Sequence, residues 1–231
     1  KEKTGSESIQ FICEATGMSW FPLALYAKKM GHCISKIRSH SMATLRRFSK
    51  RKRKSDHLDA RILVKAPLID EDSLQKIQLP DALTFALKRA CRQRDKFTRE
   101  CTRIKDRILS FCHWAMPGVK ECFDDPFSDL ARSFYWHFTD PFKAKKQGIE
   151  GIREKLEKET GGKVQDSVLR KIYQRILSSC KLFEETEEYL SFKYTTEEMR
   201  LDLQFLKAME KLEKMAEKRV EVLYKKVHPV K

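Results

Sequence analysis

Apolar and polar positions follow two different patterns along this chain. In the first part, residues 8–13 form a short apolar run, residues 33–37 alternate, and residues 19–30 between them have helical spacing. Short apolar or alternating runs indicate strands, whereas apolar positions three and four residues apart indicate a helix. A short helix is expected at residues 41–48. This β-α-β-α order predicts an α/β layer with at least one parallel pair of strands.

A further helix is expected from Ser55 to about Lys65. Ser55 can cap its start, and Pro67 should stop it because proline lacks the backbone N–H that a helix needs. A connector is expected from there to about Pro80.

The second pattern is helical and begins at Asp81. Residues 81–115 contain almost no helix-breaking residue, and their seam alternates steps of four and three, which is typical of a heptad repeat. Its members are Leu83, Leu87, Ala90, Arg94, Phe97, Cys101, Ile104, Ile108 and Phe111. Residues 123–160 look mixed, with short turns at Asp125-Pro126 and Asp140-Pro141.

Two more helices are expected, at residues 164–189 and 196–227. The last has one stripe of Phe205, Met209, Leu212, Ala216 and Leu223. Long helices on either side of an insertion predict an antiparallel coiled-coil arm or a plain helical bundle, and the periodicity does not separate the two. We therefore expect two domains, an α/β domain at residues 1–78 and a helical, coiled-coil domain at residues 79–231.

Positive charge is concentrated in one segment. The 231 residues include 48 Lys or Arg and 33 Asp or Glu, a net charge of +15, yet no Asp or Glu occurs from Ala15 to Ser55. A localised positive field favours a polyanionic partner such as DNA, RNA or an anionic membrane. The candidates for phosphate binding are Arg46, Arg47, Lys50, Arg51, Lys52, Arg53 and Lys54. A solvated loop is the alternative.

Other classes of protein are disfavoured. No apolar run approaches the roughly 20 residues that span a bilayer, and no secretory signal is visible. The seven cysteines include no Cys-x-x-Cys pair, so we expect neither a disulfide framework nor a zinc site. Free cysteines fit the reducing cytoplasm, and we expect a cytoplasmic location.

Three carboxylates are candidates for a metal site. Asp56 and Asp59 are three residues apart and share one face of a helix, and Glu14 follows a strand, where open α/β sheets bind ligands. Carboxylate oxygens suit Mg²⁺ or Mn²⁺, and two such ions can bind the attacking and leaving oxygens of a phosphodiester. The alternative is that both aspartates only favour the helix start, since acidic first turns are common.

Two ordered motifs resemble a known family. Glu14-Ala15-Thr16-Gly17 and Lys54-Ser55-Asp56-His57-Leu58-Asp59-Ala60 are similar to motifs of the DEDD-type insertion-sequence transposases, in which Ser55 would be Thr. These are bacterial and archaeal recombinases with a RuvC-like, RNase H-like amino-terminal domain. Arg92-x-Arg94 and Arg99-x-x-x-Arg103 also resemble the basic coiled-coil helix of that family.

The resemblance implies metal-dependent cleavage and exchange of DNA strands, with Mg²⁺ or Mn²⁺ as cofactor. Glu14, Asp56 and Asp59 match the last three of the four acidic metal ligands of the family. The first Asp would precede Lys1 and a serine-bearing domain would follow Lys231, so we expect a piece of an active recombinase.

The resemblance also implies partners: DNA, a structured guide RNA, and further copies of the chain through the coiled coil. Arg92, Arg99 and Arg103 would bind nucleic acid. Lys88, Arg89, Lys96, Lys105 and Arg107 extend this basic helix surface. All eight of these basic residues could equally serve only solubility.

Two other interpretations remain open. A non-catalytic module for DNA or structured RNA would use the basic surface and need no metal. A coiled-coil assembly protein would form stable oligomers with little affinity for nucleic acid.

Overall fold

The computed structural model describes residues 9–14, 17–37, 39–48, 56–69, 74–186 and 189–229. The chain divides into two compact units, Lys1–Ala82 and Leu83–Lys231, and each is described by itself. Among the described residues, the first is a small α/β unit and the second contains helices and no strand, which confirms the expected fold class and is consistent with a partial RNase H-like domain.

A three-stranded mixed sheet forms the centre of the first unit. Strand β1 (Gln10–Glu14) pairs in parallel with β2 (Cys33–Ile37), so that Glu14 lies opposite Ile37. Strand β3 (Leu74–Lys76) pairs with β2 in the antiparallel direction, which gives the order β1-β2-β3. The parallel pair was predicted. The third strand was not, because three residues are too few to show an alternating pattern.

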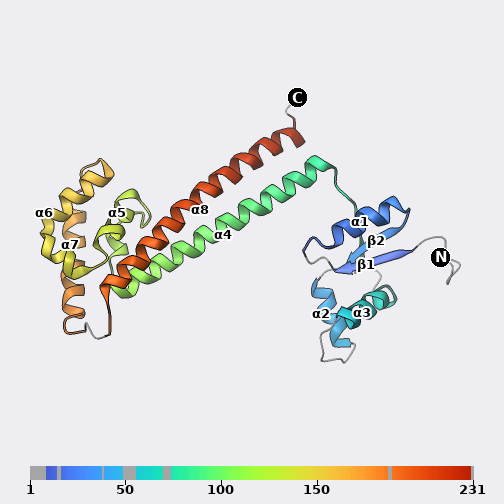
Figure 1. Ribbon diagram of the computed structural model, residues 1–231, viewed down its shortest axis with the longest axis horizontal. Helices are drawn as coiled ribbons and strands as arrows, with labels where there is room; N and C mark the ends of the chain where they lie inside the picture. The colour runs from blue at the N-terminus through green and yellow to red at the C-terminus, as the bar shows by residue number, and fades with distance from the viewer. Residues whose placement is uncertain are drawn as a thin grey trace. The chain divides into compact units, whose positions relative to one another are not determined.

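Helices cover both faces of this sheet (Figure 1). On one face α1 (Trp20–Lys29) buries Ala24 and Ala27 against Ile34. On the other, α2 (Ser39–Phe48) and α3 (Asp56–Ile69) bury Met42, Leu45 and Ala66 against Ile37. Ile34 and Ile37 face opposite ways because side chains alternate along a strand.

The expectation that Pro67 ends helix α3 is wrong. The helix includes Pro67 and continues to Ile69. A proline in the last turn removes only one hydrogen bond of the helix, and the burial of Ala66 holds this turn against the sheet.

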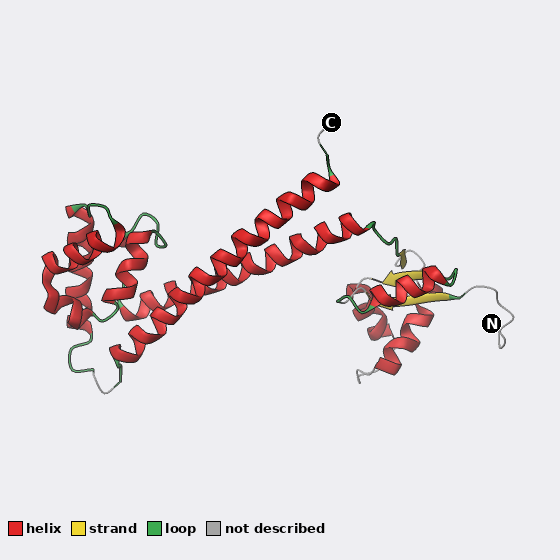
Figure 2. Ribbon diagram, turned by 45° about the horizontal axis from the view of Figure 1, so that its top comes forward, coloured by secondary structure: helices red, strands yellow, loops and turns green. Residues whose placement is uncertain are grey.

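The second unit contains α4 (Ala82–Ala115), α5 (Asp129–Phe138), α6 (Pro141–Thr160), α7 (Asp166–Leu182) and α8 (Phe192–Val227), with a short 3₁₀ turn, η2, at Lys120–Cys122. Helices α4 and α8 lie side by side and run in opposite directions, and α5, α6 and α7 gather at the end where α4 stops and α8 starts (Figures 1 and 2). The second unit thus combines both sequence-based alternatives, an antiparallel arm and a small bundle.

Two boundaries differ from expectation. Residues 123–160, expected to be mixed, contain α5 and α6, and the helix expected to reach Tyr189 ends at Leu182. The Asp140-Pro141 pair is a helix start and not a turn: the Asp140 side chain accepts hydrogen bonds from the backbone N–H groups of Phe142 and Lys143.

The main core lies where the arm meets the bundle. It includes Ile108 and Phe111 of α4, Phe134 of α5, Leu156 of α6 and Leu206 of α8. The heptad seam of α4 is buried at Ala90 and from Cys101 onward, whereas Leu83 at its start is 45% exposed.

Candidate active site and nucleic-acid-binding surface

The helix and the strand that carry the predicted carboxylates lie against each other. Glu14 is the last residue of β1, and Asp59 lies in the first turns of α3; both side chains are partly buried. Helix α3 contacts β1. Side-chain hydrogen bonds also hold β1 against β2. The Gln10 amide donates to the Ser35 hydroxyl at 3.3 Å, and the Cys13 thiol donates to the Ser35 carbonyl at 3.6 Å.

The donor atoms suit a hard cation. Glu14 and Asp59 offer carboxylate oxygens, which Mg²⁺ and Mn²⁺ prefer. Asp56 begins α3, but its side chain is outside the described part of the structure. Among the side chains that are described, no group of three His, Cys, Asp or Glu could hold a metal ion. The three-carboxylate site therefore stays a prediction, with two of its members on elements that touch.

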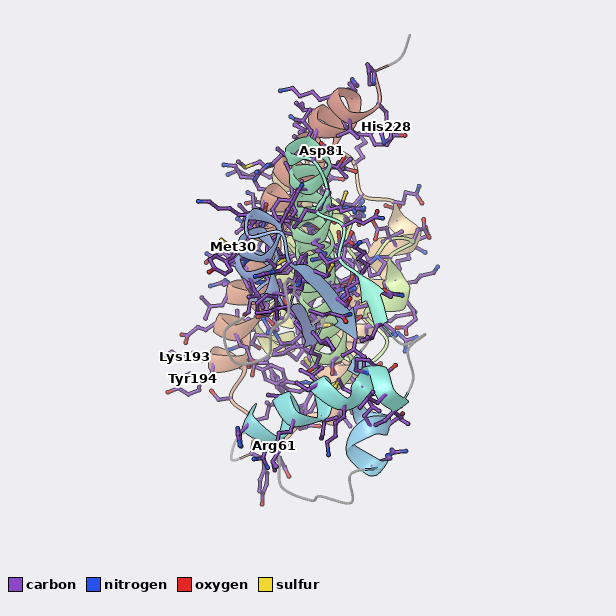
Figure 3. The ribbon with its side chains drawn as sticks, turned by 90° about the vertical axis from the view of Figure 1, so that its right-hand side faces the viewer. Met30, Arg61, Asp81, Lys193, Tyr194 and His228 are labelled. Carbon is purple, nitrogen blue, oxygen red and sulfur yellow. The ribbon has the colours of Figure 1, made fainter. Side chains whose placement is uncertain are left out.

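Most of the predicted basic loop is also outside the described residues. Arg47 is exposed near the end of α2. The side chain of Arg46 and the whole of Lys50, Arg51, Lys52, Arg53 and Lys54 fall outside the description. Arg61, on the exposed side of α3, is a described cation of the same unit (Figure 3).

A row of exposed cations follows α4, here named the α4 cationic stripe. Its members alternate steps of three and four residues and therefore share one face of the helix: Arg89, Arg92, Lys96, Arg99 and Arg103. At 1.5 Å per residue this row is about 21 Å long. It contains all three arginines predicted from the sequence to bind nucleic acid, Arg92, Arg99 and Arg103.

The stripe borders a cleft shared with α8. The cleft holds about 490 Å³ and is lined by Arg89, Ala90, Arg92, Gln93, Lys96, Phe97 and Arg219, none of them acidic. A second hollow of about 330 Å³ follows along α4 and includes Asp95 and Glu100. Glu100 pairs with Arg103 at 2.7 Å. The first cleft is thus lined by cations without a carboxylate, whereas the second hollow includes two carboxylates.

Arg219 was not predicted from the sequence. It belongs to α8, more than a hundred residues beyond the stripe, and only the antiparallel pairing of the two helices brings it there. The spacing of basic residues along α4 could not have revealed it.

Two other basic residues of α4 have internal roles. Arg107 pairs with Asp202 of α8, and the Lys105 ammonium lies 3.7 Å from the Glu210 carboxylate. Both belong to the contacts that join α4 to α8, so the structure separates them from the α4 cationic stripe.

The buried cysteines are not suited to nucleophilic chemistry. Burial raises the pKa of the Cys112 thiol to about 12, and burial together with Glu213 raises the pKa of Cys101 to about 11. Both thiols stay protonated near neutral pH, whereas the thiolate is the nucleophile. A membrane-spanning helix is not found in the part of the chain that the structure describes.

Comparison with known proteins identifies the family. Residues 1–117, just over half of the chain, match the IS110 model of DEDD transposases, whose description is "Transposase". The matched part includes Glu14, Asp56, Asp59 and all of α4. No curated protein and no solved structure matches the chain. The chain belongs to the IS110 family of DEDD transposases.

Proposed function

We propose that this chain supplies the metal-binding carboxylates and a phosphate-binding surface of a recombinase that cuts and exchanges the DNA strands of a mobile element. The contact between α3 and β1 is the observation that carries the proposal. It joins the two elements whose motifs the sequence singled out, in the part of the chain that matches the transposase family.

Glu14, Asp56 and Asp59 are assigned to Mg²⁺ or Mn²⁺. When bound there, the ion would stabilise negative charge on phosphoryl oxygens and favour deprotonation of the attacking group. The protein's part is to hold the carboxylates in place, through the pairing of β1 with β2 and the packing of Ala66 and Ile62 of α3 on the sheet.

The α4 cationic stripe and Arg219 are assigned to phosphates of DNA. Family membership implies DNA binding, and a row of exposed cations with few carboxylates attracts a polyanion over its full length. The basic residues from Arg46 to Lys54 would add to this charge in the first unit. Phe97 is the one aromatic residue that lines the cleft, so base stacking would contribute little, and we assign the arginines and Lys96 to backbone phosphates.

The proposal includes a structured guide RNA and self-association through the arm. Protein purified at moderate salt should carry one discrete RNA, which extraction and sequencing would identify. Heterogeneous host nucleic acid that high salt removes would contradict guidance. Light scattering of the purified chain would give the number of copies.

Strand cleavage tests the catalytic part. In the full-length recombinase, Asp59→Asn should abolish cleavage of donor DNA in Mg²⁺ and leave DNA affinity unchanged. Asp124→Asn is the matched control, because Asp124 is an exposed carboxylate of the helical unit. Full cleavage by the Asp59 variant would reject the assignment.

A non-catalytic nucleic-acid-binding module is the second candidate. The α4 cationic stripe favours it, because the stripe needs no metal to bind phosphates. It predicts the same affinity for DNA in EDTA and in Mg²⁺, with no cleavage by either the parent or the variant. The third candidate, a coiled-coil assembly protein, predicts oligomers without affinity for nucleic acid at physiological salt.

A further inference from the structure

The outer side of α8 carries a second apolar seam. Leu201, Phe205, Leu212, Met215 and Val222, here named the α8 outer stripe, are between 41% and 65% exposed. Their positions follow steps of four and three from Leu201 to Met215 when the exposed Ala208 is included. Arg219, which lines the cleft with α4, lies between Met215 and Val222. The stripe extends over about 31 Å of helix, between the ends of α8 that Lys193 and His228 mark in Figure 3.

This seam is distinct from the one that faces α4. The inward face of α8 buries Met199, Leu206, Met209 and Ala216. The stripe predicted from the sequence mixed the two faces: its Met209 and Ala216 are buried, whereas its Phe205 and Leu212 are exposed. Two heptads of exposed apolar side chains, with Val222 one heptad beyond Met215, are unusual for a free surface and are typical of a face that receives another helix.

Three acidic residues of α8 bond to other helices, whereas Glu197, Glu198, Glu217 and Glu221 are exposed. Asp202, Glu210 and Glu213 bond to α4 and α5, through Arg107, Arg132 and the Thr98 hydroxyl. Exposed lysines follow one flank of the outer stripe, here named the α8 lysine row: Lys207, Lys211, Lys214 and Lys218. None of the four forms an ion pair with any residue that the structure describes.

We propose that the outer side of α8 docks an acidic amphipathic helix of another polypeptide. The heptad spacing favours a helical partner, whose apolar seam would bury the outer stripe. Helical geometry places Lys211 and Lys218 directly beside the stripe, where the partner's flanking positions would need Glu or Asp.

A second copy of α8 fits this face poorly. In an antiparallel pair, the residues that flank the seam on one side of a helix face the same positions of the other helix. Lys211 and Lys218 would therefore approach the same lysines of the other copy. In a parallel pair they would approach Met209 and Ala216, which α4 already covers. The self-association proposed above would therefore use a different surface.

Nucleic acid also fits it poorly. A phosphate backbone would neutralise the lysine row but would leave the aliphatic stripe exposed to water. Unpaired bases stack on aromatic rings, and Phe205 is the one aromatic member of the stripe.

The test uses a fluorescent synthetic helix of about four heptads, with Leu at the seam positions and Glu at the flanking positions, which prevents self-pairing. We expect saturable binding to the full chain, measured by anisotropy without nucleic acid or metal. Leu212→Asp with Met215→Asp should weaken binding at least about tenfold. Lys211→Glu with Lys218→Glu should do the same, whereas Lys163→Glu with Lys181→Glu, an equal change of charge elsewhere on the helical unit, should not.

Exchange of the charges keeps the test independent of folding. The Lys211→Glu, Lys218→Glu chain should bind a probe whose flanking positions are Lys, and the unchanged chain should not. The proposal would be overturned if the acidic probe did not bind, or if the chain associated with itself and Leu212→Asp abolished that association. It would also be overturned if Lys211→Glu with Lys218→Glu lowered the affinity for duplex DNA as much as Arg92→Gln with Arg99→Gln in the α4 cationic stripe.

Discussion

Arg132 of α5 holds both carboxylate oxygens of Glu210 of α8, with nitrogen–oxygen distances of 2.7 and 2.8 Å. The same guanidinium donates to the Phe127 carbonyl at 2.6 Å, and the Lys105 ammonium of α4 lies 3.7 Å from Glu210. One carboxylate thus connects three helices. The pair lies at the junction of the arm and the bundle, where α4, α5 and α8 share a core.

Removal of Arg132 should destabilise the helical unit. Arg132→Ala leaves a partly buried carboxylate without its two strongest hydrogen bonds, which costs about 1–3 kcal/mol. Urea unfolding followed by circular dichroism measures the change. Arg153→Ala is the control, since the two carboxylates that pair with Arg153, Glu150 and Asp166, are exposed to water, and the midpoint should shift little. Equal shifts in the two variants would mean that the Arg132 pair has no special weight.

The same pair makes stability depend on acid. Hydrogen bonds from Arg132 lower the pKa of Glu210 below its ordinary value of 4.5. A lowered pKa in the folded state contributes stability above the unfolded value, and this is lost as pH falls through the folded value. The difference in unfolding free energy between the chain and its Glu210→Gln variant should therefore be constant near neutral pH and shrink below about 4.5. A difference that stays constant down to pH 3 would contradict this coupling.

Metal binding can be measured without cleavage. Glu14→Gln and Asp59→Asn should each weaken Mn²⁺ binding at least about tenfold, since even the loss of groups behind the ligands costs 10–100-fold. Electron paramagnetic resonance of free Mn²⁺ gives the affinity. Circular dichroism of each variant shows whether the fold is kept, and unchanged Mn²⁺ affinity in both would remove these residues from the site.

The α4 cationic stripe should bind DNA in a salt-dependent manner. Arg92→Gln with Arg99→Gln should lower duplex affinity by similar factors for unrelated sequences and reduce the slope of log affinity against log salt by about 2. Lys163→Gln with Lys181→Gln removes the same charge elsewhere and should leave the slope nearly unchanged. A loss confined to one DNA sequence would indicate base recognition instead.

The sequence predicted elements whose own pattern was strong and missed those that depend on their neighbours. The parallel strands and α4 have clear periodicity and lie close to where they were expected. Strand β3 has three residues and exists through its bonds to β2, and α6 begins at an Asp-Pro pair that also suits a turn.

The same limit applies to the candidate sites. Glu14 and Asp59 are found from local motifs, and their elements meet as the α/β order implies. The exposed cations of α4 and those that pair with α8 look alike in sequence. Arg107 differs from Arg103 because Asp202 of α8 pairs with Arg107 alone. Such pairings cannot be read from one helix alone.

The antiparallel course of α4 and α8 has a further consequence for the architecture of the helical unit. The chain leaves along one helix and comes back along the other, so the start of α4 and the end of α8 lie at the same end of the arm (Figure 1). Heptads could be added to or deleted from both helices together without changing the distance between this entry and exit. The length of the arm can therefore change while the distance between the start of α4 and the end of α8 stays the same.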